Sequence, residues 1–453
     1  MLDELEGAMA TAALKFLRDG LVFAVLGGAV GALTAMLSVA VDAAAEAFEA
    51  YPQLGWLLPV AGLATYGFYR ATGVDFAWST ASVAKAARNG EEVPLRLVPA
   101  VVVGTVLTVL CGGSVGKEAA ALQMAAGASG SFRRQLSAEG RLWAAPAAMG
   151  AALGAMLGVP AAGVVFSFEV LRRRPSDGGA VVAPTIAAAA AWIVTEACGV
   201  RFLPQVAEAL SGEWACLAAM AHSGFETGDL GFSGAAMALV VPVLFVGAVS
   251  GAVGAGFCRA VSMLRCGLAR LGAPVFALAV GGVAVSLLLG YAEVLGYGGV
   301  RVYCGPGADL AAVAVEGGVL PWWSFALKGA LTLLTFAGGF KGGEIMPVLA
   351  VGACLGNAIG VLAVGACGIV FSGQGLAAVV AGAPSAVIAL FSAVGVASFF
   401  SSCTKCPLTA CVLSLGLFGP EVAVLAAPAA FLSSLCAPRV GLYPTALSSD
   451  SDG

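Results

Sequence analysis

Hydrophobic residues occur along this chain in long runs that polar segments separate. A membrane-spanning helix needs about 20 mostly apolar residues, and several runs approach that length. They cover Leu21–Val41, Leu57–Tyr69, Val93–Gly113, Leu142–Met156, Val181–Val200, Ala235–Phe257, Val275–Leu295 and Trp322–Phe336. The pattern therefore predicts an all-α polytopic membrane protein with the lipid bilayer as its surroundings.

The composition indicates the same class. Of 453 residues, 60% are hydrophobic and 11% are charged, with a mean hydropathy of +0.97, whereas soluble proteins are about 25% charged. The 63 glycines are typical of close helix packing and interrupted helices in lipid. A net charge of −4 gives no reason to expect a nucleic acid as a partner.

Polar stretches divide the chain into two similar halves. We predict a cytoplasmic N-terminal segment over residues 1–20, a first membrane half over 21–200, an extracytoplasmic linker over 201–232, a second membrane half over 233–445 and a short polar tail over 446–453. The linker is the longest polar stretch between apolar runs. We expect a multi-pass protein of the cell membrane.

A glycine-rich break carries charge where the surrounding sequence excludes it. Gly116, Lys117 and Glu118 follow a long apolar run and precede Ala119–Ser129, which has helical composition. A helix N-terminus offers unpaired N–H groups and a positive dipole, so an anion can bind there. We expect the backbone of Gly116, Lys117 and Ala119 to contribute to such a site. The Glu118 carboxylate can itself occupy the site or compete for it.

A second break of the same kind lies in the other half. Gly338–Pro347 again contains a double glycine, a lysine and a glutamate, and Glu344 follows Glu118 by 226 residues, half the chain length. Two interrupted hydrophobic segments at corresponding positions indicate a transporter binding site where the halves meet. We expect the backbone of Ile345 and Met346 to face it.

Two further polar segments allow more than one interpretation. Ser79 and Thr80 follow Trp78 in a polar break, which is either a third interrupted helix start with hydroxyl donors or an interfacial turn anchored by the tryptophan. Lys117 and Lys341 are expected to support the site, paired with carboxylates or extended toward solvent, rather than to bind the anion directly.

Other charged and sulfur-containing residues receive structural interpretations. Glu169 is expected to pair with the Arg172–Arg174 cluster that follows it. Cys403 and Cys406 are the one close cysteine pair, and they lack the additional cysteine or histidine ligands that a zinc site requires. We therefore expect no metal and no cofactor. Hydrolytic and nucleotide-driven enzymes are not indicated either, because their motifs are missing from the sequence.

Five segments resemble, in order, the motifs of the CLC family of chloride channels and anion/proton antiporters. Gly116–Glu118 resembles its GREGP motif, Gly158–Glu169 its NxPxAG…FxxE helix, Gly343–Pro347 its GxFxP segment, Cys406–Thr409 its RAPLT turn and Gly441–Tyr443 its pore tyrosine. The resemblance implies an inverted repeat of broken and tilted helices, and a homodimer with one pore in each subunit. It also implies an anion pathway with a proton gate, formed by Glu118, Glu344 and Tyr443.

Departures from the chloride pattern resemble the fluoride-specific CLC-F branch. Glu344 stands where chloride members carry an apolar residue, and Val170 stands where chloride-type antiporters carry a second proton-handling glutamate. The resemblance therefore implies fluoride/proton antiport, with Glu344 as the second proton-handling residue. Met346 replaces the threonine usual in that branch, and the central pore position, assigned to Ser79 and Thr80, lacks its methionine.

Two alternatives remain open from the sequence. One is a chloride/proton antiporter or a voltage-gated-type chloride channel of the same fold. The other is a membrane-embedded enzyme or a scaffold that transports nothing. The second alternative predicts that Glu118 and Glu344 lie more than one helix diameter, about 10–12 Å, from any anion path.

Overall fold

The described part of the computed structural model comprises residues 2–170, 178–200, 234–270, 272, 274–294, 299–370, 383–436 and 440–443. Helices make up almost all of it, and its one extended pairing is an isolated bridge between Gly116 and Gly343. The predicted all-α fold is confirmed. The predicted linker over 201–232, the tail over 446–453 and the Arg172–Arg174 cluster lie outside the described residues.

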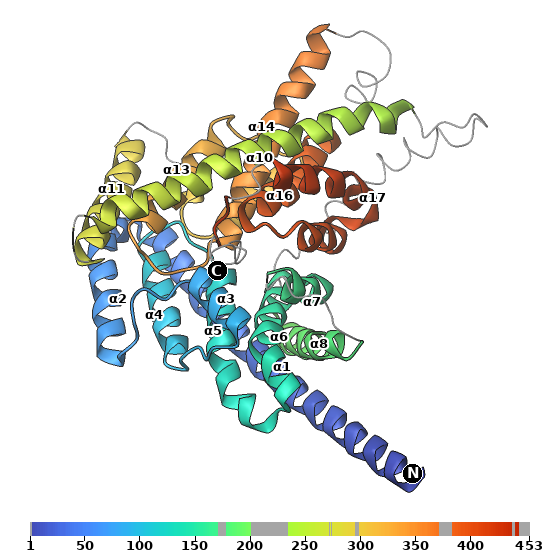
Figure 1. The fold of residues 1–453 in the computed structure, drawn as a ribbon. Coiled ribbons are helices and arrows are strands. Elements are labelled where there is room, and N and C mark those ends of the chain that lie inside the picture. Colours follow the sequence, from blue (N-terminus) through green and yellow to red (C-terminus); the bar gives the residue numbers. More distant parts are fainter. Residues whose placement is uncertain are drawn as a thin grey trace.

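Helices of the first half lie together in Figure 1, coloured blue to green. They are α1 (Leu2–Ala50), α2 (Leu58–Thr72), α3 (Thr80–Asn89), α4 (Leu97–Leu110), α5 (Glu118–Ser129), α6 (Ala138–Leu157), α7 (Pro160–Glu169) and α8 (Gly178–Ala197). Short 3-10 helices occur at Pro52–Leu57 and Gly130–Gln135. Helix α1 includes most of the predicted N-terminal segment, because it begins at Leu2.

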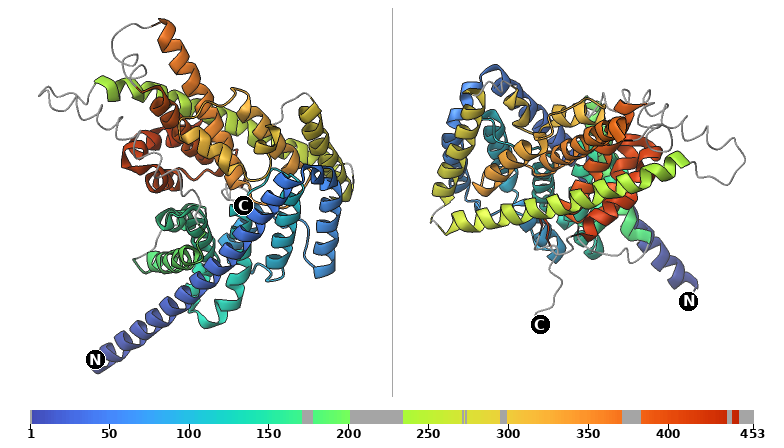
Figure 2. Two further views of the ribbon diagram at one scale, coloured as in Figure 1. Left: turned by 180° about the vertical axis from the view of Figure 1, so that it is seen from behind. Right: turned by 90° about the horizontal axis from the view of Figure 1, so that it is seen from above.

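Helices of the second half form the other group, coloured yellow-green to red. They are α10 (Gly234–Ala269), α11 (Pro274–Val294), α12 (Ala308–Val315), α13 (Ser324–Ala337), α14 (Ile345–Val370), α16 (Pro384–Thr404) and α17 (Pro407–Leu435), with a 3-10 helix at Val300–Tyr303. Helix α11 packs against α2, and α17 packs against α7. The two groups therefore touch at more than one place, as the views in Figure 2 also show.

Six described helices are long and apolar enough to cross a bilayer, namely α1, α10, α11, α14, α16 and α17. Two apolar helices, α4 and α13, have 14 residues each and are shorter than a full crossing. Transporters commonly contain discontinuous membrane helices, which are short and end at a break inside the protein. The multi-pass membrane architecture is thus confirmed.

Glycines allow the central helices to approach closely. Helix α16 is buried from Ala386 to its end at Thr404 and packs against α10, α14 and α17. A Cβ atom added to Gly352 of α14 would lie 2.5 Å from the carbonyl oxygen of Gly395 of α16. No side chain fits in that space, so the two backbones can pack this closely only through glycine.

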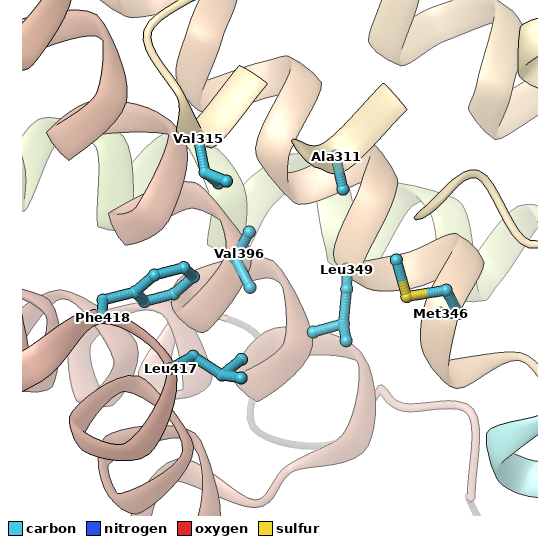
Figure 3. A pocket seen from close by; sticks show the side chains of 7 residues that line it. All are labelled: Ala311, Val315, Met346, Leu349, Val396, Leu417 and Phe418. Atoms are coloured by element: carbon cyan, nitrogen blue, oxygen red, sulfur yellow. The ribbon is translucent and has the colours of Figure 1, made fainter. Parts of the chain in front are cut away.

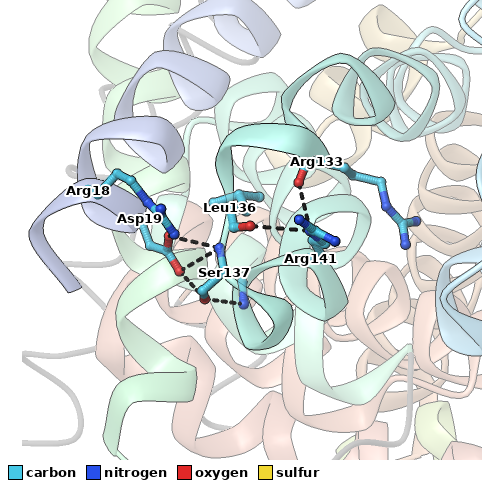
Figure 4. Close-up of polar contacts among 7 residues, drawn as sticks. Arg18, Asp19, Arg133, Leu136, Ser137 and Arg141 are labelled. Atoms are coloured by element: carbon cyan, nitrogen blue, oxygen red, sulfur yellow. Dashed lines mark hydrogen bonds and ion pairs between the residues drawn. The ribbon is translucent and has the colours of Figure 1, made fainter. Parts of the chain in front are cut away.

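Capping interactions fix helix ends far apart in sequence. Asp19 of α1 accepts from the Ser137 backbone N–H over 3.1 Å and from its hydroxyl, while the Ser137 hydroxyl oxygen accepts from the N–H of Gly140 over 3.1 Å. Nearby, Nε of Arg141 donates to the carbonyl of Arg133 over 3.0 Å (Figure 4). Asp19 thereby attaches α1 to the N-terminus of α6.

The predicted partners of Glu169, Arg172–Arg174, lie outside the described residues, and Glu169 has other partners that the sequence did not indicate. Its carboxylate accepts from the backbone N–H groups of Leu408 (2.8 Å) and Thr409 (2.7 Å) and from the Thr409 hydroxyl (2.7 Å). These donors belong to the first turn of α17, where backbone N–H groups have no partner within the helix. Glu169 therefore caps α17 and joins the two halves.

Candidate anion site

The two glycine-rich breaks meet in space. The Gly116 N–H donates to the carbonyl of Gly343, and the Gly343 N–H donates to the carbonyl of Gly116, each over 2.6 Å. Each break precedes a helix, α5 after the first and α14 after the second. The reciprocal pair therefore brings the N-termini of α5 and α14 together at the centre of the molecule.

Backbone donors line this meeting point. The N–H groups of Ala119, Ile345 and Met346 belong to the first turns of α5 and α14, where a helix supplies no acceptor. Pro347 contributes no donor, because proline lacks an N–H. Gly116, which the sequence placed among the anion-binding residues, uses its N–H in the bridge to Gly343 instead.

Glu118 lies at the start of α5 and is fully buried. Neither carboxylate oxygen has a hydrogen-bond partner of normal geometry in the described chain, although the backbone N–H groups of Glu118 and Met346 lie near enough to interact with it. A Cβ on Gly116 would collide with this carboxylate and would lie 2.9 Å from Cβ of Met346. The carboxylate thus lies beside the N-terminus of α14.

Glu344 lies directly before α14 and is half-buried. Its Oε2 accepts from the Thr80 hydroxyl over 3.2 Å, and that hydroxyl accepts from Nε2 of Gln123 over 3.0 Å. The buried Tyr443 hydroxyl also interacts with Glu344, though its geometry falls short of a normal hydrogen bond. Three residues that were assigned to the pathway from the sequence, Thr80, Glu344 and Tyr443, therefore lie close together.

Ser79 and Thr80 have different surroundings. Ser79 is the N-cap of α3, and its hydroxyl accepts from the backbone N–H of Ser82 in a capping box. A helix therefore starts at this break, as the first of the two interpretations required. Thr80, one residue further, directs its hydroxyl to Glu344.

The two lysines of the breaks act as supports. Nζ of Lys117 lies 2.6 Å and 2.7 Å from the two carboxylate oxygens of Asp42 on α1. Nζ of Lys341 donates to the carbonyls of Phe76 (2.6 Å) and Trp78 (3.0 Å) and lies 4.0 Å from the centre of the Phe76 ring. Lys117 is paired with a carboxylate as predicted. Lys341 instead holds the segment that leads into α3.

Two buried polar residues near the site, Lys328 and Gln123, were not among the residues that the sequence assigned to it; Lys328 was expected either to line an aqueous entry or to lie at an interfacial helix end. Nζ of Lys328, on α13, donates to the Ser114 hydroxyl (2.9 Å) and to the carbonyls of Tyr303 (3.0 Å) and Gly305 (2.7 Å). Lys328 belongs to the second half, so it holds the first break in place through contacts between the halves.

Gln123, on α5, was missed altogether. Its position five residues after Glu118 was the available signal, because both residues lie on the one helix that starts at the break.

An apolar pocket lies on the other side of Met346. Ala311, Val315, Leu349, Val396, Leu417 and Phe418 line it together with Met346 (Figure 3). These side chains come from α12, α14, α16 and α17. Met346 therefore contributes its backbone to the N-terminus of α14 and its side chain to an apolar surface.

Comparison with known proteins gives consistent results. The voltage gated chloride channel family matches residues 60–438. The chain is 30% identical over 419 residues to the chloride/fluoride channel protein of Pseudomonas syringae pv. tomato (strain ATCC BAA-871 / DC3000). The aligned region covers 91% of this chain and 82% of that protein.

Solved structures show the same fold. A CLC-type fluoride/proton antiporter has a TM-score of 0.75 at 24% identity, covering 95% of this chain and 98% of that one. A slow cyanobacterial chloride/proton antiporter has a TM-score of 0.69 at 17% identity, covering 95% and 96%. At these identities the likeness concerns the arrangement of helices.

Proposed function

The chain belongs to the CLC family, the voltage-gated chloride channels and their antiporter relatives, and from that premise we propose that it exchanges fluoride for protons across a membrane. The family shares the activity of anion transport. The relatives named above include both channels and antiporters. The proposal adds the anion, the coupling to protons and the residues that handle both. We expect it to act in the cell membrane as a homodimer with one pathway in each subunit.

The observation that carries the proposal is the surroundings of Glu118. Its carboxylate is fully buried, lies beside the N-terminus of α14 and has no normal hydrogen-bond partner in the described chain. Burying an unpaired charge is costly, so the group gains from taking up a proton or from moving away. An anion that takes its place meets the unpaired N–H groups of two helices.

Glu344 supplies the second proton-handling group. It replaces the family's usual inner glutamate, since position 170 is valine. Its half-buried carboxylate contacts Thr80 and faces Tyr443. A proton that binds there adds a hydrogen-bond donor to the pathway. Protons and anions therefore act at one place, which is the requirement for coupled exchange.

Fluoride is the anion that this donor set favours. It is small and strongly hydrated, so it needs short, strong hydrogen bonds to replace its water. A protonated carboxyl and a phenol hydroxyl provide such donors, in Glu344 and Tyr443. The P. syringae relative is named as a chloride/fluoride channel protein, which is consistent with either anion.

One observation favours the alternative, chloride/proton antiport. Met346 places a long apolar side chain at the start of α14, where the fluoride branch usually has a hydroxyl. Chloride is larger and more easily dehydrated, and it tolerates apolar surroundings better than fluoride.

Proton movement driven by an anion gradient tests the coupling. Purified protein in liposomes, loaded with fluoride and diluted into fluoride-free buffer, should take up protons from the outside as fluoride leaves. Fluoride efflux with no proton uptake would contradict antiport and would leave a channel.

A further inference from the structure

Three polar side chains form a hydrogen-bonded chain from Glu344 to α5. The Thr80 hydroxyl donates to Oε2 of Glu344 over 3.2 Å, and Nε2 of Gln123 donates to the Thr80 oxygen over 3.0 Å. Gln123 is 4% exposed, and its Oε1 atom has no hydrogen-bond partner in the described part of the chain. A buried amide oxygen without a partner is unfavourable, so packing alone does not explain this residue.

Thr80, the middle member of these three hydrogen-bonded side chains, has a single hydrogen to donate. While Glu344 is ionised, the Thr80 hydroxyl donates to the carboxylate, and its oxygen accepts from Gln123. Once Glu344 is protonated, its own O–H donates to the Thr80 oxygen, and the Thr80 hydrogen becomes available to Gln123. A turn of the carboxamide by about 180° then lets Oε1 accept this hydrogen and gives that oxygen the partner it lacks while Glu344 is ionised, a rotation that the terminal torsion allows.

We propose that Glu344, Thr80 and Gln123 form a relay. The protonation state of Glu344 decides which end of the Gln123 carboxamide faces the unpartnered position, by which we mean the place where Oε1 lies in this structure without a hydrogen-bond partner. The carbonyl oxygen faces it when Glu344 is ionised, and the NH₂ group faces it when Glu344 is protonated. The oxygen repels an anion and the NH₂ group attracts one. Gln123 is thus a positioning residue that links anion binding to proton uptake, an inference that rests on the exchange proposed above.

The relay requires no proton transfer beyond Glu344. The proton that Glu344 takes up comes from solution and returns there, while Thr80 and Gln123 only reorient their existing N–H and O–H bonds. Two other groups act on Glu344 from neighbouring elements, namely Arg265 of α10 through its charge and Tyr443 through its hydroxyl. Neither contacts Gln123 in a described hydrogen bond, so a change at Gln123 leaves both in place.

Gln123→Met tests the relay, because methionine has a similar size and makes no comparable hydrogen bond. We would reconstitute the purified protein in liposomes and measure the number of protons moved per fluoride from the reversal potential. The ratio should fall about tenfold, the scale of one lost buried hydrogen bond, while fluoride flux stays measurable. Thr80→Val should have the same effect, and Thr80→Ser should retain the wild-type ratio.

Two comparisons separate a relay from general damage. The Gln123→Met/Thr80→Val double variant should be no worse than either single variant, because both interrupt one chain. Asn357→Leu removes a buried carboxamide that donates to the Gly318 carbonyl over 2.7 Å. It should lower the Tm and leave the ratio unchanged. Each variant must elute as a single species before its ratio is compared.

The experimental results that would overturn the relay differ from those that would overturn fluoride/proton exchange. A wild-type ratio in Gln123→Met, or an equal fall in Asn357→Leu, would overturn the relay while fluoride/proton exchange stands. If the wild type exchanges chloride rather than fluoride for protons, the fluoride assignment fails and the same variants test the relay with chloride. A wild type that moves no protons with either anion would overturn both.

Discussion

Gly116 and Gly343 exchange two backbone hydrogen bonds of 2.6 Å each, although they lie in different halves of the chain. Each glycine ends a break that leads into a helix, so this pair fixes the distance between the N-termini of α5 and α14. The candidate anion site is therefore formed by contact between the halves, and neither half contains it alone.

A side chain at this contact should disrupt transport. In Gly343→Ala, the new Cβ would lie 2.7 Å from the Ala119 nitrogen and 2.9 Å from the Gly116 oxygen. Overpacking of this kind costs about 1–3 kcal/mol, and here it separates the two helix ends. We expect anion flux to fall at least tenfold, a change of about 1.4 kcal/mol, together with a lower Tm. The matched control is Gly329→Ala, whose Cβ meets nothing within 4 Å; equal losses in both variants would contradict the account.

Lys328 should matter through its support of the first break. Lys328→Met leaves the Ser114 hydroxyl and two carbonyl groups without their donor, and each such loss costs about 1–3 kcal/mol. We expect a clear fall in Tm, measured by thermal unfolding in detergent, and reduced anion flux. Lys85→Met, on the exposed side of α3, should change neither quantity. A Lys328→Met protein with wild-type Tm would show that the buried amine is dispensable.

Glu118 should be needed for proton coupling and dispensable for anion movement. Glu118→Gln keeps the size of the side chain and removes its charge, so it can no longer alternate between a proton and the anion site. Anion flux should continue in liposomes, while proton uptake should fall below about a tenth of the wild-type level, the size expected when a proton-transfer group is removed. Glu46→Gln, exposed on α1, provides the control. Persistent proton uptake in Glu118→Gln would rule out this gate.

Substitutions of Glu344 and Glu169 should have different effects on coupled transport and on stability. Glu344→Ala removes the proposed second proton-handling group and should reduce coupled transport at least tenfold, or about 1.4 kcal/mol. Glu169→Ala removes a cap from α17 and should lower stability by about 0.5–2 kcal/mol without changing the proton to anion ratio. Measuring both quantities for both variants checks this. A changed ratio in Glu169→Ala alone would show that the proton route is wrongly assigned.

The sequence predicted the parts of the site that depend on local pattern. Charge and glycine inside apolar runs located both breaks, and the helices begin at Glu118 and Ile345, within a residue or two of the expected positions. Residue types also identified Lys117 as a supporting charge, because a lysine in an apolar environment must find a partner.

Contacts between distant segments could not be predicted in the same way. Glu169 was expected to pair with arginines a few residues away, which lie outside the described residues; the partners that the structure shows, Leu408 and Thr409, lie about 240 residues further along the chain. The Gly116–Gly343 bridge likewise depends on how the halves pack. Gln123 was missed because an apolar sequence around a helix does not show which face meets Thr80.

Anion selectivity tests the central claim most directly. Purified wild-type protein in liposomes loaded with equal fluoride and chloride would be followed with both ion-selective electrodes, against protein-free liposomes and the Glu344→Ala variant. The account predicts fluoride efflux at least tenfold above chloride efflux, equivalent to about 1.4 kcal/mol, with that preference reduced in Glu344→Ala. Equal rates, or efflux of chloride alone, would contradict fluoride transport.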